Sequence, residues 1–234
     1  RHGSVRSSAM TRTLAVLFAT LPLALTAAEN LPPVGLPRLE RTNLLVYRDV
    51  AGNMQRVRSR KDWPHRRAEI VRGLERVMGV LPGNEKRGAL DVKVEEETDC
   101  GSYVRRLITY QSEPGGRVPA YLLIPKDALS GKQKAPGIIC LHPTDNTIGH
   151  KVVVGLGGRP NRQYAAELAE LGFVTLAPAY PLLANYQPDL KALGWESGTL
   201  KAVWDNIRGL DLLESLPFVN AKAGFGTIGH SLGG

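Results

Sequence analysis

The order of apolar and polar positions predicts antiparallel strands first and a parallel sheet after them. Residues 90–97 alternate between apolar and polar side chains, and residues 103–111 alternate in part, as strands with one solvated face do. Residues 118–125 form a third predicted strand, and the turn signal Glu-Pro-Gly-Gly before it makes a hairpin of the last two. Ahead of these strands, apolar side chains at helical spacing predict a helix over 62–78, with Asp62 as its N-cap.

Apolar runs and helical segments alternate in the second half of the chain. Residues 135–142 and 172–181 are apolar runs, which are typical of strands buried on both faces. A helix is predicted between them over 162–171, and another over 199–216 precedes a short buried strand over 225–228. Strands and helices that alternate with short connections form parallel sheets. We therefore predict one α/β domain whose mostly parallel sheet has antiparallel N-terminal strands.

The helix over 199–216 has the clearest apolar stripe. Lys201 and Asp205 on this helix are spaced for a surface ion pair, as are Arg208 and Asp211, and each such pair contributes only a few tenths of a kcal/mol. The side chains expected to face the core are Leu200, Val203, Ile207, Leu210, Leu213 and Leu216.

The composition excludes several classes of protein. With 234 residues, 43% hydrophobic and 22% charged, the chain is long enough to bury a core and is unlike disordered, collagenous or coiled-coil sequences. The net charge is +8, but aromatic residues make up only 6% and no basic stripe contains them, so nucleic-acid binding is not expected. Two cysteines are too few for a disulfide scaffold. A Cys100–Cys140 bridge stays open, although the apolar run around Cys140 favours a small buried side chain.

The first 28 residues are interpreted as upstream residues followed by a secretory signal peptide over about 10–28. Arg12 supplies the basic beginning, residues 14–25 are apolar, and small side chains close the segment. A stretch this short, at about 1.5 Å per residue, cannot cross about 30 Å of hydrocarbon. We therefore expect a secreted or periplasmic protein with no stable membrane span after cleavage. An extended N-terminal arm is expected over 29–61, since its first part is rich in proline.

One pentapeptide carries a chemical prediction. Gly229-His230-Ser231-Leu232-Gly233 matches G-x-S-x-G and follows a predicted strand in an α/β order. A nucleophilic serine on a sharp strand-to-helix turn needs small neighbours, because the backbone is strained and larger side chains collide there. The N–H of Leu232 is placed to stabilise a developing oxyanion. The pattern predicts Ser231 as nucleophile and Leu232 as an oxyanion donor, while the alternative is a glycine-rich turn that serves packing alone.

Three stretches of this sequence resemble one enzyme family. They are GWESGTLKAVWDNIRGLDLLESLPFVN at 194–220, IGHSLGG at 228–234 and ICLHPTD at 139–145. Residues 62–234 thereby resemble the N-terminal part of an α/β-hydrolase of the dienelactone hydrolase and acetyl xylan esterase-like kind. The resemblance implies a Ser–His–Asp hydrolase with Ser231 as nucleophile.

The same resemblance implies that the loop after the strand over 135–142 supplies the second oxyanion donor. Pro143 has no N–H, so Thr144 is the expected donor. His142 is expected to be structural and not a base. Asp145 and His150 are expected near the mouth of the pocket, with no assigned role. No His, Asp or Glu cluster has metal-ligand spacing, so no metal or other cofactor is expected.

The triad acid and histidine have no candidates in this sequence. In α/β-hydrolases both follow the nucleophile along the chain, and only three residues follow Ser231. We expect the sequence to be the N-terminal part of a longer serine esterase that acts on small-molecule or carbohydrate esters of carboxylic acids. The resemblance implies acetyl esters of carbohydrates as the preferred substrate class. Without its base, Ser231 is a poor nucleophile, so the fragment is expected to be inactive.

Three alternatives stay open. A serine peptidase of the prolyl-oligopeptidase kind shares the elbow, although about 60 preceding residues are too few for a β-propeller. A non-catalytic α/β-hydrolase-like binding protein would lack the acid or the histidine. The glycines of 152–160 partly match a dinucleotide loop, but Pro160 stands where the third glycine belongs.

Overall fold

The computed structural model describes residues 35, 37, 39 and 42–234, so the predicted signal peptide lies outside the described residues. Contacts divide the chain into two units, Arg1–Arg72 and Gly73–Gly234, and the second unit holds the large sheet. Among the helices of the described residues, none combines the length and the apolar character that a membrane crossing requires.

The first unit holds a short hairpin and the beginning of a helix. The strand β1 (Val46–Arg48) pairs antiparallel with β2 (Met54–Arg56). The turn between them is closed by Asp49, whose Oδ1 accepts the N–H groups of Ala51 and Asn53. This hairpin lies within 29–61, the range expected to be an extended arm. It was not predicted because strands of three residues are too short to leave a clear alternating pattern.

The helix α1 (Trp63–Met78) confirms the helix predicted over 62–78. Asp62 precedes it, but its Oδ2 accepts the N–H groups of Arg58 and Ser59, which lie upstream of the helix. These hydrogen bonds lower the pKa of the Asp62 carboxyl. The side chain of Asp62 therefore closes the turn that leads into α1, which corrects its predicted role as the N-cap.

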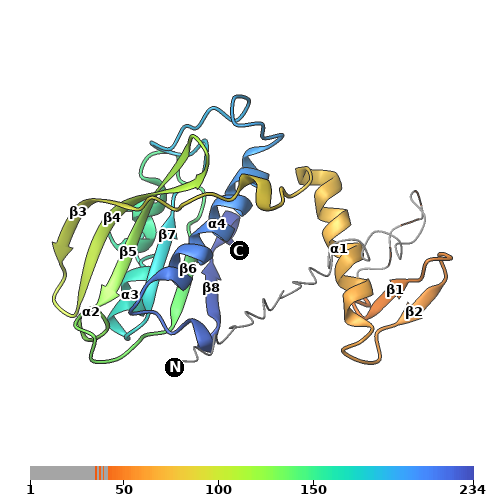
Figure 1. Cartoon of the computed structure of the whole chain (residues 1–234), viewed down its shortest axis with the longest axis horizontal. Helices are drawn as coiled ribbons and strands as arrows, with labels where there is room; N and C mark the ends of the chain where they lie inside the picture. Colours follow the sequence, from red (N-terminus) through yellow and green to blue (C-terminus); the bar gives the residue numbers. More distant parts are fainter. Residues whose placement is uncertain (1–34, 36, 38, 40–41) are drawn as a thin grey trace, which may run out of the picture. The chain divides into compact units, whose positions relative to one another are not determined.

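The second unit is built on a six-stranded sheet with the order β3-β4-β5-β7-β6-β8 (Figure 1). The first four strands in this order pair antiparallel, whereas β6 pairs in parallel with both β7 and β8. The predicted α/β fold is thereby confirmed. The strands are β3 (Lys93–Asp99), β4 (Tyr103–Glu113), β5 (Gly116–Pro125), β6 (Gly137–Leu141), β7 (Val174–Pro178) and β8 (Phe225–Gly229).

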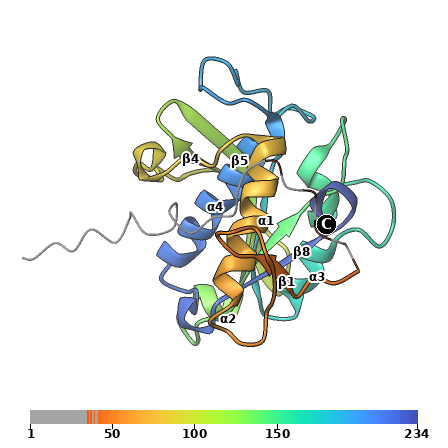
Figure 2. The ribbon, with the colours of Figure 1, turned by 90° about the vertical axis from the view of Figure 1, so that its right-hand side faces the viewer.

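Helices cover both faces of this sheet (Figure 2). The helix α4 (Gly198–Ser215) packs into a core cluster with Leu122, and α3 (Tyr164–Glu170) packs into a second cluster with Leu123. Neighbouring residues of a strand point to opposite faces, so α4 and α3 lie on opposite sides of the sheet. The remaining helices are α2 (Lys126–Leu129) and the 3-10 helices η1 (Asn84–Lys86), η2 (Gly149–Val154), η3 (Ala221–Ala223) and η4 (Ser231–Gly233).

The strand β8 is exposed, so the prediction of a buried strand over 225–228 is wrong. It pairs with β6 on one side and is the last strand in the order of the sheet. Phe225 is half-buried, and Ile228 remains 37% exposed. The apolar composition of a strand does not say whether it has a neighbour on both sides.

Both ion pairs predicted on the helix α4, Lys201–Asp205 and Arg208–Asp211, are formed, but their predicted location on the surface is wrong because α4 buries charged side chains. Lys201 and Asp205 are 0% exposed, and Arg208 is 5% exposed. Val203 and Ile207 from the predicted stripe are only half-buried. The buried face of α4 is thus rotated from the predicted one.

The buried charges form a network centred on Lys201. Its Nζ lies 2.5 Å from Asp205 Oδ1 and 3.0 Å from Glu113 Oε1, and donates to Ser112 Oγ at 3.0 Å. Burial raises the pKa of Asp205, opposed by Lys201. Burial also raises the pKa of Glu113, but hydrogen bonds from Lys86 and Lys201 outweigh it, and the net pKa is lowered. The carboxylates of Glu113 on β4 and of Asp205 on α4 itself thus make burial of Lys201 tolerable.

The two cysteines are free. Cys140 is buried, as expected, and burial raises the pKa of its thiol to about 12. Cys100 packs against the same core cluster from a half-buried position. The structure therefore contains no Cys100–Cys140 bridge.

Candidate active site

The strand β8 runs into a sharp turn at Ser231. His230 is extended, with φ −134° and ψ 139°, and Ser231 then has a φ of +57°. Few non-glycine residues adopt this left-handed conformation, which costs energy and is concentrated at functional sites. The 3-10 turn η4 follows, closed by the N–H of Gly233 bonding to the His230 carbonyl at 3.1 Å. The strand and the sharp turn of the predicted elbow are both present.

Close backbone approaches explain the two glycines of the motif. A Cβ at Gly229 would lie 1.9 Å from the carbonyl oxygen of Gly233. A Cβ at Gly233 would lie 2.2 Å from the carbonyl oxygen of Leu141, at the end of β6. Both neighbours are backbone atoms, so neither contact can be relieved by turning a side chain. The turn can pass between β8 and β6 only without side chains at these positions.

We predict that Gly229→Ala and Gly233→Ala each lower the free energy of unfolding by about 2 kcal/mol or more, because the backbone must shift to remove the contact. Gly73→Ala is the matched control, since a Cβ there meets nothing within 4 Å and alanine favours the helix. Denaturant titration measures the three differences. Wild-type stability in both elbow variants would contradict the close approach.

A pocket of about 330 Å³ brings the predicted nucleophile and the predicted oxyanion loop together. Ser231 and Thr144 both line it, from segments that are far apart in the sequence. Both residues are exposed, so a substrate can reach them. The full lining is Pro143, Thr144, Asp145, Val152, Arg159, Arg162, His230 and Ser231.

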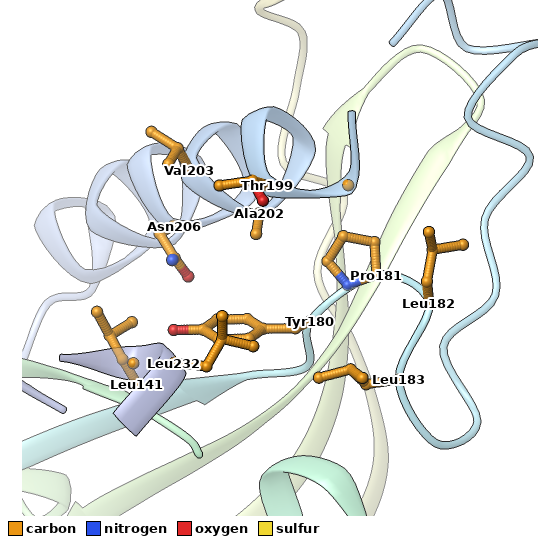
Figure 3. Close-up of a pocket in the computed structure, with 12 residues that line it drawn as sticks. Leu141, Tyr180, Pro181, Leu182, Leu183, Thr199, Ala202, Val203, Asn206 and Leu232 are labelled. Carbon is orange, nitrogen blue, oxygen red and sulfur yellow. The ribbon is translucent and has the colours of Figure 1, made fainter. Parts of the chain in front are cut away.

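Leu232 faces a different cavity, with its side chain in an apolar pocket of about 440 Å³ (Figure 3). This pocket lies between α4 and the loop that follows β7, and Tyr180 and Leu141 also line it. Among the described residues, the N–H of Leu232 bonds to no backbone acceptor outside its own turn. It therefore remains a candidate donor to an oxyanion.

His142 is fixed in a structural role at the base of the oxyanion loop. It is 0% exposed, and its Nε2 accepts the N–H of Tyr180 at 3.1 Å. Since Nε2 accepts, the proton is on Nδ1, which donates to the Pro143 carbonyl at 2.7 Å. Burial lowers the pKa of His142, in keeping with a neutral ring. Both nitrogens are engaged away from Ser231, as expected for a structural histidine.

Asp145 holds the other end of the oxyanion loop. Its Oδ1 accepts the N–H groups of Thr147 at 2.9 Å and Ile148 at 2.8 Å. Backbone hydrogen bonds lower the pKa of the Asp145 carboxyl, and the hydrogen bond from the N–H of Ile148 has the largest effect. His142 and Asp145 together fix the loop on either side of Thr144.

His150 lies inside the protein and not at the pocket mouth, which corrects its expected position. It is 2% exposed and packs against Tyr121 in a tilted arrangement, with ring centroids 5.0 Å apart. Burial lowers its pKa to about 3, so the ring is neutral. Its burial comes from η2, a 3-10 helix over a segment for which the sequence predicted no regular structure.

Arg159 and Arg162 are pocket residues that the sequence did not identify. They belong to the segment between η2 and α3, where Arg159 falls in the partial dinucleotide motif over 152–160 and Arg162 was expected to begin the helix over 162–171. Such a loop needs a strand directly before its glycines, but Gly149–Val154 is a 3-10 helix here. The dinucleotide alternative therefore lacks its structural context. Only the fold brings these arginines to Ser231, so no local pattern could have identified them.

Comparison with known proteins gives structural neighbours but no sequence relatives. No family model and no curated protein matches this sequence. A solved structure from Bacteroides fragilis NCTC 9343, assigned by its name as an acetyl xylan esterase, matches with a TM-score of 0.55 and 16% identity over 74% of this chain and 48% of its own. The acetyl xylan esterase from Paenibacillus sp. R4 gives a TM-score of 0.46 and 18% identity, over 62% of this chain and 48% of its own.

The chain therefore spans about half the length of these two solved structures. At such low identity the likeness concerns the fold. The chain has the α/β-hydrolase fold, and Ser231 lies in the turn that follows β8.

Proposed function

We propose that the whole protein is a serine hydrolase that cleaves carboxylic esters, with acetyl esters of carbohydrates as the preferred class, through an acyl-enzyme on Ser231. The observation that carries this proposal is the strained φ of +57° at Ser231 between two glycines that tolerate no side chain. A turn used only for packing has no need of a strained, exposed serine at its apex. The acetyl xylan esterases among the structural neighbours support the same class of substrate.

The proposed reaction uses groups on both sides of the pocket. Ser231 Oγ attacks the ester carbonyl, and the N–H groups of Leu232 and Thr144 bind the oxyanion that forms. The alcohol leaves after it has received a proton, and water then cleaves the acyl-serine bond to release the acid. No cofactor has a part in these steps.

The proton acceptor is proposed to lie beyond the residues in hand. Among the described residues, Ser231 Oγ forms no hydrogen bond with a histidine, and both ring nitrogens of His142 are already engaged. Residues 1–234 are therefore proposed to be an inactive N-terminal part of the protein. The protein is also proposed to carry a signal peptide over about 10–28 and to be directed to the periplasm or outside the cell. A serine without its base keeps an ordinary hydroxyl and reacts slowly.

The experiment is to extend the reading frame past the codon of Gly234 and to express the full-length protein. We expect roughly 100–150 further residues with an Asp after a strand and a His beyond it, as the fold requires. Hydrolysis of p-nitrophenyl acetate and of acetylated xylan is then expected from the full-length protein, and none from residues 1–234. Ester hydrolysis by residues 1–234 that depends on Ser231 would overturn the assignment of an inactive part.

Two alternatives make different predictions in the same assay. A peptidase of the prolyl-oligopeptidase kind would cleave proline amides faster than acetyl esters. A non-catalytic binding protein would lack the acid or the histidine in the extended frame and would turn over neither substrate.

A further inference from the structure

Two arginines share the pocket with the proposed nucleophile. Arg159 and Arg162 line it together with Ser231 and with Thr144 of the oxyanion loop. Arg162 is half-buried just before α3, and Arg159 is exposed in the preceding loop. A ligand bound in this pocket therefore lies beside two arginines.

Neither guanidinium is engaged within the protein. Across residues 42–234, the guanidinium groups of Arg159 and Arg162 form no ion pair and no hydrogen bond. The guanidinium groups of Arg87, Arg106 and Arg117, in contrast, each bind a carboxylate. A structural role for arginine normally involves such a partner. The two pocket arginines thus keep their hydrogen-bond donors available.

The one carboxylate of the pocket does not neutralise them. The Oδ1 of Asp145 accepts backbone N–H groups of its own loop, which keep the carboxylate ionised but engaged. With two guanidinium groups and one carboxylate, the charged groups leave a positive balance beside Ser231, and His230 is the other titratable side chain there. An anionic ligand would be attracted to this pocket.

The loop that carries Arg159 is packed against the pocket wall. A Cβ at Gly158 would lie 3.1 Å from Cγ2 of Val152, so the backbone of the loop rests on that side chain. Val152 is buried and itself lines the pocket. Next along the chain, the N–H of Arg162 bonds to Gln163 Oε1 at 3.1 Å. The backbone positions of both arginines are therefore determined by local contacts.

The two sides of the elbow differ in chemistry. The pocket at Leu232 is lined mostly by apolar side chains of α4 and of the loop after β7 (Figure 3). The pocket at Ser231 carries charged side chains from two segments of the chain, Asp145 from the loop after β6 and the two arginines from the loop before α3. The charged side has no explanation in the hydrolysis of a neutral acetyl ester alone.

We propose that Arg159 and Arg162 bind a carboxylate of the substrate, so that esters with a negative charge close to the scissile bond are preferred. Guanidinium groups match carboxylates because two parallel N–H groups bond to the two oxygens. The preference in turnover rests on the proposed esterase function, whereas the carboxylate site rests on the pocket alone. Two kinds of molecule present this chemistry, a uronic acid within a polysaccharide and a half-ester of a short dicarboxylic acid.

Binding to the full-length protein carrying Ser231→Ala tests the site without turnover. Calorimetric titration compares methyl glucuronoside with methyl glucoside, and monomethyl succinate with dimethyl succinate. We expect about tenfold tighter binding of the charged member in at least one pair, as two partly exposed charge-assisted contacts would give. The pair that shows the difference identifies the source of the carboxylate. Equal binding in both pairs, or binding of inorganic phosphate as tight as that of the carboxylate, would overturn the proposal.

Substitutions locate the effect. Arg159→Ala and Arg162→Ala should each remove most of the preference, and Arg162→Lys should restore part of it because the charge remains without the planar fork. Arg105→Ala, at a half-buried arginine of β4 outside the pocket, is the matched control. Thermal unfolding of each variant shows whether it is folded. An equal loss in the Arg105 variant would contradict a role of the pocket arginines.

Rates of ester hydrolysis, measured with charged and neutral esters, distinguish a failure of this inference from a failure of the proposed function. If the wild-type full-length protein hydrolyses esters without preference for charge, the carboxylate site is wrong and the esterase stands. If carboxylates bind as expected and no ester is hydrolysed, the esterase is wrong and the carboxylate site stands.

Discussion

Replacing Ser231 by alanine in the full-length protein is expected to lower kcat/KM for acetyl ester hydrolysis by about 10⁴-fold or more, the loss typical of removing a serine nucleophile. The reason is that no other hydroxyl stands on the strained apex between β8 and η4 in the described part of the chain. The binding of substrate should change little, because alanine removes only the attacking oxygen. Initial rates with p-nitrophenyl acetate over a range of concentrations give both parameters.

Ser130→Ala is the matched control for this substitution, since Ser130 is an exposed serine after α2 and outside the pocket. It should retain wild-type kcat/KM. Activity above about 1% in the Ser231 variant would mean that another group starts the reaction, and the proposed mechanism would be wrong.

Replacing Lys201 by methionine is expected to destabilise the protein by about 3–5 kcal/mol, the cost of breaking a buried ion pair from one side. Lys201 is 0% exposed and lies between the carboxylates of Asp205 and Glu113. Its removal leaves the buried Asp205 without a cation, whereas Glu113 keeps Lys86 as its partner. Without Lys201, both carboxyl pKa values should rise in the folded state. The destabilisation should therefore shrink as the pH falls and the carboxylates take up protons.

Denaturant titration at neutral and at acid pH measures this effect, with Lys222→Met as the control because Lys222 is exposed in η3. The control should stay within about 0.5 kcal/mol of the wild type at both values. A Lys201 variant as stable as the wild type at neutral pH would contradict the network. A loss independent of pH would indicate that packing, and not charge, is what Lys201 contributes.

Much of the fold was predictable because each strand of the six-stranded sheet leaves a local signal. The alternation over 103–111 and the apolar runs over 135–142 and 172–181 correspond to β4, β6 and β7. The predictions that failed depend on neighbours remote in sequence. The exposure of β8 depends on which strands stand beside it, and the burial of Lys201 depends on Glu113 of β4, since spacing of four residues suits exposed and buried pairs alike.

In the candidate site, too, the residues with a local sequence signal were predictable, and those that depend on remote neighbours were not. Ser231 could be predicted because the elbow imposes glycines within two residues of it, as the close approaches at Gly229 and Gly233 explain. Thr144 was reached only through family resemblance. The pocket arginines belong to a loop without a motif, and they meet Ser231 only because β6 and β8 are neighbours in the sheet.

The central claim is that Ser231 is the nucleophile of an ester hydrolase, and covalent labelling of the full-length protein tests it most directly. A fluorophosphonate reacts with an activated serine and leaves a stable adduct that peptide mass spectrometry can locate. We predict one adduct, on Ser231, formed in parallel with the loss of esterase activity and absent from the Ser231→Ala variant. Full inactivation with Ser231 unmodified, or no adduct in a protein that hydrolyses esters, would contradict the account.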